Sequence, residues 1–573
     1  MIRFIAGGPR SLISKTSRCL FEPLESRTLL SAAGNYQHVL IISIDGLHQE
    51  DLADPALRAD LSNILGLASN GVSYPNAHLP GPSDSFVGVM GYFTGAGPNT
   101  TGVYYDNTYD RSLTAPGGSA SDPKGTEVLY DEFIDKNSNL ITGGGDYGRG
   151  SIDPAKLPID FSSGSARLIY PHDYSNVNTI FEVAHEAGLY TAYSDKHPSY
   201  DLVSGPSGAG LDDFYGPEIA AKAAIVNGKL VDASTAPAGT KLTKISKVTS
   251  LTEAYDNLKI QAIINQIDGK TSLGTKSAPV PNLFGFNLQA VNVAQKDPAG
   301  GIDLDAAGNE VVSSQMHEAL THTDAGIARI IAELKAKNLF NSTLVILTAK
   351  HGQTPRIGSA KNLAPDVFTG VLESAGIEVA QATQDASSIM WLKDPSQTAA
   401  AVAALNALKG TAADPRIDTI LSGDSLAAAG LASSANRTPD LVVVLKPGIL
   451  ISDSFKRAEH GGFSEEDTHV PIIISGGGLN RGSRGRIIAE GVQTTQIAVT
   501  ALRALGLDPH QLQGAVVEHT TGLPGLGLHS HDQDQDGDFA ASSSTFPVQA
   551  SESASIFFTH SVKRSDLFSD VDE

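Results

Sequence analysis

The patterned part of the chain begins with an apolar run, VLIISIDGL, from Val39 to Leu47, which stops at Asp45 and Gly46. A short apolar run that ends in a turn signal is typical of a strand buried on both faces. Ligands of open α/β sheets gather outside the carboxyl ends of the strands, so Asp45 is placed to hold a metal ion or a substrate group. An Asp-Gly pair that only opens a turn explains the same residues, and the run alone does not decide between the two.

Strands and helices alternate along the rest of the chain. The pattern predicts helices over residues 57–68, 178–188, 314–338 and 494–508, and strands over 189–195, 342–352, 439–451 and 468–478. This alternation predicts an α/β fold with a mostly parallel central sheet and helices on both faces. An Ala-rich block, 362–436, reads as an inserted α+β cap subdomain between the two parts of the core, 36–361 and 437–528.

The two ends of the chain lack any apolar period, and we expect both to be disordered. Residues 529–573 form an acidic tail, and residues 1–35 read as a targeting segment. Met1 to Arg18 carries four basic residues and no acid, but it lacks the apolar stretch of a standard secretory signal. The following FEPLESRTLLSA, Phe21 to Ala32, resembles the LEPR-type segment near the start of many large exported bacterial proteins. That resemblance implies export to the periplasm or the extracellular space.

Composition narrows the function classes. With 573 residues and 41% hydrophobic content, the chain is able to bury a large core, and its formal net charge of -22 argues against a nucleic-acid-binding surface. The single cysteine, Cys19, excludes an intrachain disulfide and the thiol ligands of structural zinc sites. No apolar run reaches the roughly 20 residues of a transmembrane helix. The sequence does not indicate an oligomeric state.

Two further strand ends repeat the arrangement at Asp45: STLVILTAKHG ends at Lys350 and His351, and His460 precedes a glycine pair ahead of another strand. Ser85 offers a candidate hydroxyl group, because the segment PSDSFVGVMGYFTG around it looks like a helix start. A helix N-terminus favours an alkoxide or a bound phosphate by about 0.3–1 kcal/mol. The ordinary alternative makes such a serine a helix N-cap.

The order Asp45, Ser85, Lys350-His351, His460 resembles the type I phosphodiesterase and nucleotide pyrophosphatase family of the alkaline phosphatase superfamily. The family's nucleophile segment reads T-F-P-N, then T-G, then G-I, then an Asn. Ser85-Phe86 falls on its Thr-Phe, Thr94-Gly95 on its T-G, and Gly102-Val103 on its G-I. The family's Asn contacts a phosphoryl oxygen; it falls on Asp106 without a gap, and assigning its role to Asn107 requires a shift of one residue. The resemblance runs from about residue 37 to 526 and implies an alkaline phosphatase-like fold.

The chain departs from the family at its metal ligands. Members bind two zinc ions through a strand-edge Asp, an Asp-His pair, an Asp-x-x-x-His pair and a final His. Here Lys350 stands in the first pair, and Gln289 and Val293 stand in the second. The resemblance therefore leaves Asp45, His351 and His460 as metal ligands, and these suit one divalent ion, zinc by analogy, rather than two.

Lys350 has two interpretations. Its ammonium group supplies a fixed positive charge to a phosphoryl group in place of a lost metal, or it marks a chain that has kept the fold without the activity. The first interpretation gives a hydrolase of phosphate diesters or pyrophosphates that works through a phospho-serine at Ser85, with Asn107 and Lys350 as catalytic partners. The second gives a non-catalytic binding or envelope protein.

A pocket segment of the family falls on SDKHPSYD, after a predicted strand. The resemblance assigns Lys196 and His197 to substrate binding, together with Gln289. A surface loop that starts at a His-Pro pair accounts for the first two nearly as well. The expected partner is a small phosphate ester.

Overall fold

The computed structural model describes residues 36–528 except 305–309, 357–361, 412–413 and 453. The expected targeting segment, 1–35, and the expected acidic tail, 529–573, lie outside the described residues. No helix among those that are described combines the length and the apolarity needed to cross a bilayer.

An eight-stranded sheet with the order β24-β2-β23-β16-β1-β13-β8-β9 forms the centre of the molecule. The apolar run at the start of the chain is β1, His38–Ile44, and it pairs in parallel with β13, Leu283–Leu288, and with β16, Thr343–Thr348. The sheet continues in parallel through β8, Thr191–Ser194, and β9, Asp213–Tyr215, whereas β23, Ile472–Ser475, runs antiparallel to β16. Strands β2, Val72–Tyr74, and β24, Arg486–Ile487, complete the edge. The expected mostly parallel α/β sheet is confirmed.

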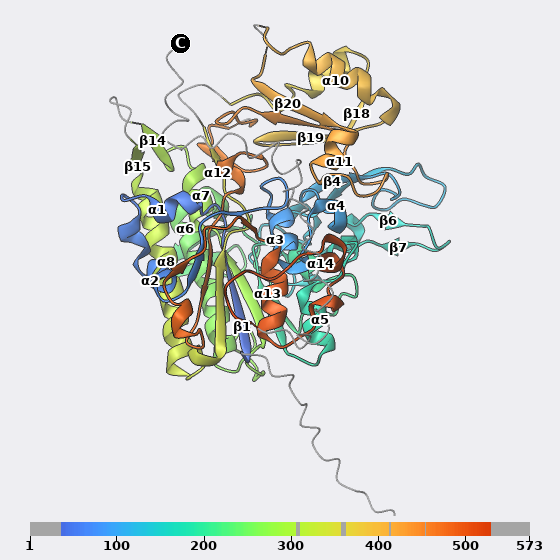
Figure 1. Ribbon diagram of the computed structural model, residues 1–573. Coiled ribbons are helices and arrows are strands. Elements are labelled where there is room, and N and C mark those ends of the chain that lie inside the picture. Colours follow the sequence, from blue (N-terminus) through green and yellow to red (C-terminus); the bar gives the residue numbers. More distant parts are fainter. Residues whose placement is uncertain (1–35, 305–309, 357–361, 412–413, 453, 529–573) are drawn as a thin grey trace, which may run out of the picture.

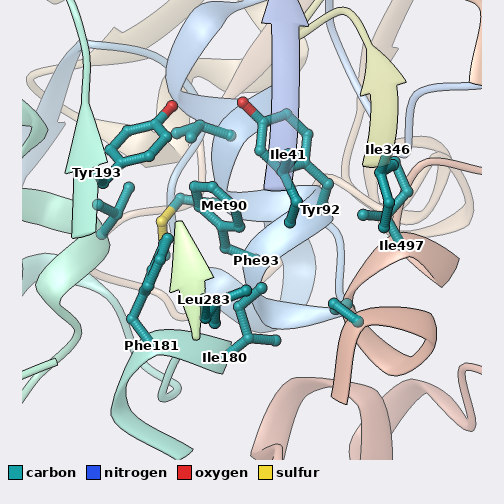
Figure 2. Close-up of a cluster of buried hydrophobic side chains, with 14 of the residues drawn as sticks. Ile41, Met90, Tyr92, Phe93, Ile180, Phe181, Tyr193, Leu283, Ile346 and Ile497 are labelled. Carbon is teal, nitrogen blue, oxygen red and sulfur yellow. The ribbon is translucent and has the colours of Figure 1, made fainter. Parts of the chain in front are cut away.

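Alternate residues of β1 enter separate cores on the two faces of this sheet, as the strand period of two requires. Val39 and Ile41 pack against α3, Ser85–Thr94, α5, Ile180–Glu186, and α13, Gln496–Ala504. Figure 2 shows part of this cluster, with Met90 and Phe93 of α3 beside Phe181 of α5.

The opposite face of the sheet carries the long helices. Leu40, Ile42 and Ile44 of β1 pack there against α2, Ser62–Ser69, α6, Thr249–Ile267, α7, Ala290–Lys296, and α8, Ser314–Ala336. Figure 1 shows the two helix layers on either side of β1. Strands buried on both faces need nearly continuous apolar sequence, which explains why β1 and β16 stand out in the sequence.

A second, antiparallel sheet with the order β18-β19-β21-β20 forms a subdomain above the carboxyl ends of the central strands (Figure 1). Its strands are β18, Val379–Gln384, β19, Ser387–Leu392, β20, Ile417–Ser422, and β21, Leu441–Leu445, and its helices include α9, Thr369–Ser374, and α10, Thr398–Asn406. The sheet takes in β21, which lies beyond the predicted end of the insertion at residue 436. Leu441, Val443 and Leu445 belong to the subdomain's own core.

Candidate active site

Ser85 is the first residue of α3, and the preceding Asp84 caps the helix. The Asp84 carboxylate accepts hydrogen bonds from the backbone N–H groups of Phe86, at 2.7 Å, and Val87, at 3.1 Å. Because Asp84 satisfies these free donors, the Ser85 hydroxyl is not used as a cap. It is 3% exposed and points toward the ends of β1 and β16.

Asp45 follows the last residue of β1 and contacts most of the other side chains of the site. Its Oδ1 accepts from Asn287 Nδ2 at 2.6 Å, its Oδ2 accepts from Gln289 Nε2 at 2.6 Å, and Oδ2 lies 3.3 Å from Ser85 Oγ. Gly46 then turns the chain with a φ of +81°, a conformation that glycine adopts without strain. Asp45, at the end of β1, therefore lies beside Ser85, the expected nucleophile.

Two lysines, the partly exposed Lys196 and the buried Lys350, flank the same carboxylate. The ammonium nitrogens of Lys196 and Lys350 lie 3.5 Å and 3.6 Å from Asp45 Oδ2. Burial by itself raises the pKa of Asp45, but Lys350 and then Lys196 override it, and the pKa of the carboxyl is lowered. Asp45 is thus held as a carboxylate.

Lys196 lies between β8 and the 3₁₀ helix Pro198–Ser204 and reaches the Ser85 hydroxyl directly. Its Nζ donates to Ser85 Oγ at 2.7 Å, and its side chain is 13% exposed, more than that of Asp45 or Lys350. Burial lowers its pKa, but Asp45 and further carboxylates outweigh burial and raise the pKa of Lys196. The residue therefore stays an ammonium group.

Lys350, directly after β16 and Ala349, is fully buried. Its Nζ donates to Asp195 Oδ1 at 2.8 Å and to the Tyr200 hydroxyl at 3.0 Å, and it lies 4.1 Å from the centre of the Tyr200 ring. Burial lowers the pKa of Lys350, and the carboxylates of Asp195 and Asp45 offset this effect only in part. Lys196 and Lys350 together neutralise Asp45 and Asp195.

His351 completes the contacts of Ser85. Its Nε2 lies 3.0 Å from Ser85 Oγ, and its Nδ1 lies 2.9 Å from the Gly352 carbonyl oxygen. A carbonyl only accepts, so Nδ1 carries the proton and Nε2 is the acceptor for the serine hydroxyl. Burial lowers the pKa of His351 to about 3, with Lys196 among the further causes, so the ring is neutral at pH 7.

His460 connects the site to the inserted subdomain. Its ring centre lies 4.6 Å from that of His351, and its Nδ1 lies 3.0 Å from the Tyr105 hydroxyl. Tyr105 donates at 2.5 Å to Asp385, which lies in the turn between β18 and β19. The subdomain therefore contributes a carboxyl group to the edge of the site.

Asn107 and Asp106 occupy different surroundings. Asn107 begins β4, Asn107–Asp110, its side-chain oxygen is buried without a partner, and no hydrogen bond among the described residues joins it to Ser85. The Asp106 carboxyl interacts with Asp84 and Lys196, and burial, followed by Asp84, raises its pKa well above the usual range. Asp106 is thus linked electrostatically to Lys196, which contacts Ser85.

His197 and Gln289, the other expected substrate-binding residues, make contacts inside the protein. His197 Nδ1 lies 2.8 Å from Glu218 Oε2, and the side chain supports the loop that carries Lys196. Besides its bond to Asp45, Gln289 Nε2 donates to Asn287 Oδ1 at 2.6 Å. Both residues border the site, and no hydrogen bond among the described residues joins either of them to Ser85.

Asp135 and Glu218 form a buried carboxyl pair behind His197, and they give a pH prediction. Burial and the neighbouring Glu218 raise the pKa of Asp135 to about 9, and burial raises that of Glu218 to about 8. Their unfolded pKa values are about 4. Folding therefore takes up protons between about pH 4 and pH 9, and stability falls as pH rises through that window.

Asp135→Asn is expected to remove part of this loss. At pH 8.5 the variant should be about 2 kcal/mol more stable than wild type and should unfold at a higher midpoint temperature. At pH 5 we expect no gain in stability. Scanning calorimetry at both pH values checks this, with the exposed Glu127→Gln as the matched control. An equal gain at both pH values would show that proton uptake is not the cause.

Two groups of His and carboxylate side chains among the described residues have donor atoms within 4.8 Å of one another: His78, Glu465 and His469, and Asp385, Glu459 and His460. In the second group, Glu459 already pairs with Lys296 and Lys456. Among the expected ligands, His351 Nε2 lies 3.8 Å from Asp45 Oδ2, and His460 has a ring contact with His351.

The surroundings of Asp45 do not fit the two-zinc centre that the resemblance implies. Both of its oxygens accept amide N–H groups, and two ammonium groups already balance its charge and that of Asp195. A dication 4 Å from one ammonium group is repelled by about 8 kcal/mol at an effective dielectric constant of 20.

Several residues of the site carried no assignment from the sequence: Asp84, Asp195, Asn287, Lys296 and Asp385. Asp195 follows an apolar strand in the same way as Asp45, so the strand-edge pattern was able to find it. No local pattern marks Asp385, because its place depends on how the subdomain packs on the core.

Solved structures share the fold. Murine ectonucleotide pyrophosphatase/phosphodiesterase 5 is 16% identical, with 82% of this chain and 96% of that chain covered and a TM-score of 0.51. An inactive form of the murine protein in complex with AMP gives the same values. Wild-type alkaline phosphatase PafA is 14% identical over 82% of this chain and 96% of its own, with a TM-score of 0.50. A comparison with curated proteins finds no match.

The sequence model of one family matches more than half of the chain. It is described as type I phosphodiesterase / nucleotide pyrophosphatase, and it matches residues 39–138 and 235–469. The match takes in Asp45, Ser85, Lys350, His351 and His460, whereas the loop that carries Asp195 and Lys196 lies between the matched segments. The chain belongs to the type I phosphodiesterase/nucleotide pyrophosphatase family of hydrolases.

Proposed function

We propose that the protein hydrolyses phosphate diesters or pyrophosphates through a phospho-serine intermediate at Ser85. The observation that carries the proposal is the set of contacts at Ser85 Oγ: Lys196 at 2.7 Å, His351 at 3.0 Å and Asp45 at 3.3 Å. A hydroxyl between an imidazole acceptor and an ammonium donor is arranged as an activated nucleophile. Membership of the family supports phosphate-ester hydrolysis in general.

Two cations lie near Ser85 and are suited to a phosphoryl group there. Lys196 is the partly exposed cation beside Ser85, and its Nζ donates to Ser85 Oγ at 2.7 Å. Lys350 lies behind Asp45 and supplies a second fixed charge. These groups are suited to the charge that develops on the nonbridging oxygens.

Acid quenching during turnover tests the proposal. The full-length protein is mixed with a chromogenic phosphodiester or with pyrophosphate, quenched in acid and digested, and the peptides are mapped by mass spectrometry. A phosphoryl group on Ser85 that appears within one turnover, and that still carries the second alcohol when the substrate is a diester, is the expected result. Turnover without phosphate on Ser85 would contradict the covalent route.

Asp106→Asn separates two assignments of the oxygen-binding residue. We place that role at Asp106, whose side chain interacts with Lys196, rather than at Asn107. An amide donates to an anionic oxygen at every pH, whereas a carboxyl donates only when protonated. Asp106→Asn is therefore expected to raise kcat/KM several-fold at pH 8 and Asn107→Ala to change it by less than about threefold, in steady-state assays of both variants. A large loss of kcat/KM in Asn107→Ala, without a change in Asp106→Asn, would assign the oxygen-binding role to Asn107.

A non-catalytic binding protein is the second candidate, and the replaced metal ligands together with the 3% exposure of Ser85 favour it. It predicts that phosphate esters bind without being cleaved. Calorimetry with a nonhydrolysable diester, alongside the turnover assay, distinguishes the two functions.

The expected single zinc ion is not part of this proposal, since ammonium groups occupy the surroundings of Asp45. Members of the family are metal-dependent in general, and metal analysis of the purified protein decides the matter. Export rests on the N-terminal segment, and fractionation of cells that express the full chain tests it.

A further inference from the structure

We infer that the protein's own side chains, Lys196, Lys350 and His351, take over the work of the metal centre, so that Ser85 is activated with no divalent ion at Asp45. The inference rests on the proposed function, because it describes how the same serine is activated. Its support is the arrangement of donors and charges around Asp45 and Ser85.

Both oxygens of Asp45 already accept hydrogen bonds. As a carboxylate it only accepts, and its two oxygens accept the Asn287 and Gln289 side-chain amides at 2.6 Å each. The amide orientations are consistent with each other, since Gln289 Nε2 also donates to Asn287 Oδ1. Gln289 stands where the family resemblance places a ligand carboxylate, and here it contributes a donor instead.

Lys350 occupies the position of the other lost carboxylate, at the end of β16. With no exposed side-chain surface and with Asp195 at 2.8 Å, its ammonium group is fixed in place. It lies 3.6 Å from Asp45 Oδ2, close to where the resemblance places a metal ion. A fixed cation at this position stabilises the charge of the Ser85–Asp45 pair without coordination chemistry.

Lys196 acts on the nucleophile itself. Its Nζ donates to Ser85 Oγ at 2.7 Å, so it stabilises the alkoxide that forms during attack. The family match does not include its loop. The cation that contacts the serine thus comes from a part of the chain outside the matched segments.

His351 serves as the proton acceptor. In a metal centre its Nε2 would bind the ion, but here that atom faces Ser85 Oγ at 3.0 Å, and the Gly352 carbonyl fixes the proton on Nδ1. A serine hydroxyl beside a neutral imidazole whose tautomer is fixed is the arrangement of a Ser–His pair.

The two steps balance without a co-reactant other than water. The Ser85 proton passes to His351 Nε2, the Oγ–P bond forms and the bond from phosphorus to the leaving oxygen breaks; the leaving oxygen then takes the proton from His351. In the second step water gives a proton to His351 and bonds to phosphorus, the Oγ–P bond breaks, and Ser85 Oγ recovers a proton.

The first experiment compares the full-length protein after exhaustive dialysis against a chelator with the same protein supplied with zinc. Ser85 phosphorylation and diester turnover are expected to agree within about twofold. Activity that is lost on chelation and restored by zinc would overturn the inference while it leaves the proposed function intact.

Zinc titration calorimetry decides the inference even if no ester is turned over. No zinc binding that depends on Asp45 is expected, so wild type and Asp45→Asn should give the same isotherm. A stoichiometric ion that binds wild type and not Asp45→Asn would overturn the inference. Absence of phosphoserine with every ester, with or without zinc, would instead count against the proposed function.

Lys196→Met and Lys350→Met test the two cations. Each is expected to slow Ser85 phosphorylation by about 10²-fold or more, with no rescue by zinc. Loss of Lys350 leaves Asp195 buried without its ammonium partner, so Lys196→Met, at a partly exposed side chain, is the variant that keeps the test independent of folding. The exposed Lys222→Met is the matched control, and a change below about threefold in Lys196→Met would overturn the inference.

Discussion

Ser85→Ala is expected to lower the rate of phosphodiester hydrolysis by about 10⁴-fold or more and to abolish the covalent phosphate. The reason is that the three contacts of Ser85 Oγ all act on one atom, and removal of the nucleophile disables the whole unit. Stopped assays with a chromogenic diester, combined with acid-quench peptide mapping, measure both effects.

The controls for Ser85→Ala separate chemistry from folding. Ser314→Ala changes an exposed serine at the same position of another helix, the first residue of α8, and is expected to leave turnover unchanged. Since Asp84 caps α3, Ser85→Ala should also keep the wild-type thermal midpoint within a few degrees. Residual activity above about a tenth of wild type would show that another group attacks phosphorus.

The fold was predictable from the sequence because its strongest signal is physical. Strands covered by helices on both faces need unbroken apolar runs, and β1 and β16 show these runs as clearly as any part of the chain. Parallel strands end at one edge, so Asp45 and His351 were expected together, and the structure brings them within 3.8 Å. The end of the inserted subdomain was harder to predict, since β21 is apolar like a core strand but pairs with β19 and β20.

The chemistry around Asp45 was less predictable. The sequence marks Lys350 as an anomaly, but it does not show that Lys196 contacts the serine, because a lysine in a His-Pro loop is ordinary surface sequence. The choice between Asp106 and Asn107 rests on a shift of one residue, and a one-residue shift near a strand start reverses which side chain faces the site. Asp385 depends on tertiary packing alone.

The close approach of α3 to β16 brings Ser85 next to His351, and Gly88 is the residue that permits it. A Cβ on Gly88 would lie 2.0 Å from the Lys350 carbonyl oxygen and 2.8 Å from its Cα, both backbone atoms. On Gly91, one turn further along the same helix, the nearest atom would be a Pro80 side-chain carbon at 3.1 Å. The two glycines therefore make a matched pair on one helix.

Gly88→Ala is expected to destabilise the protein by about 3 kcal/mol and to lower turnover by about 10²-fold. Alanine improves helix propensity by about 1 kcal/mol, but overlap with rigid backbone costs more, and α3 has to move away from β16 to relieve it. A displacement of about 1 Å between Ser85 and His351 accounts for the loss of rate. Thermal unfolding and diester turnover measure the two effects, with Gly91→Ala expected near wild type in both. Equal behaviour of the two variants would show that the contact between α3 and Lys350 does not position the nucleophile.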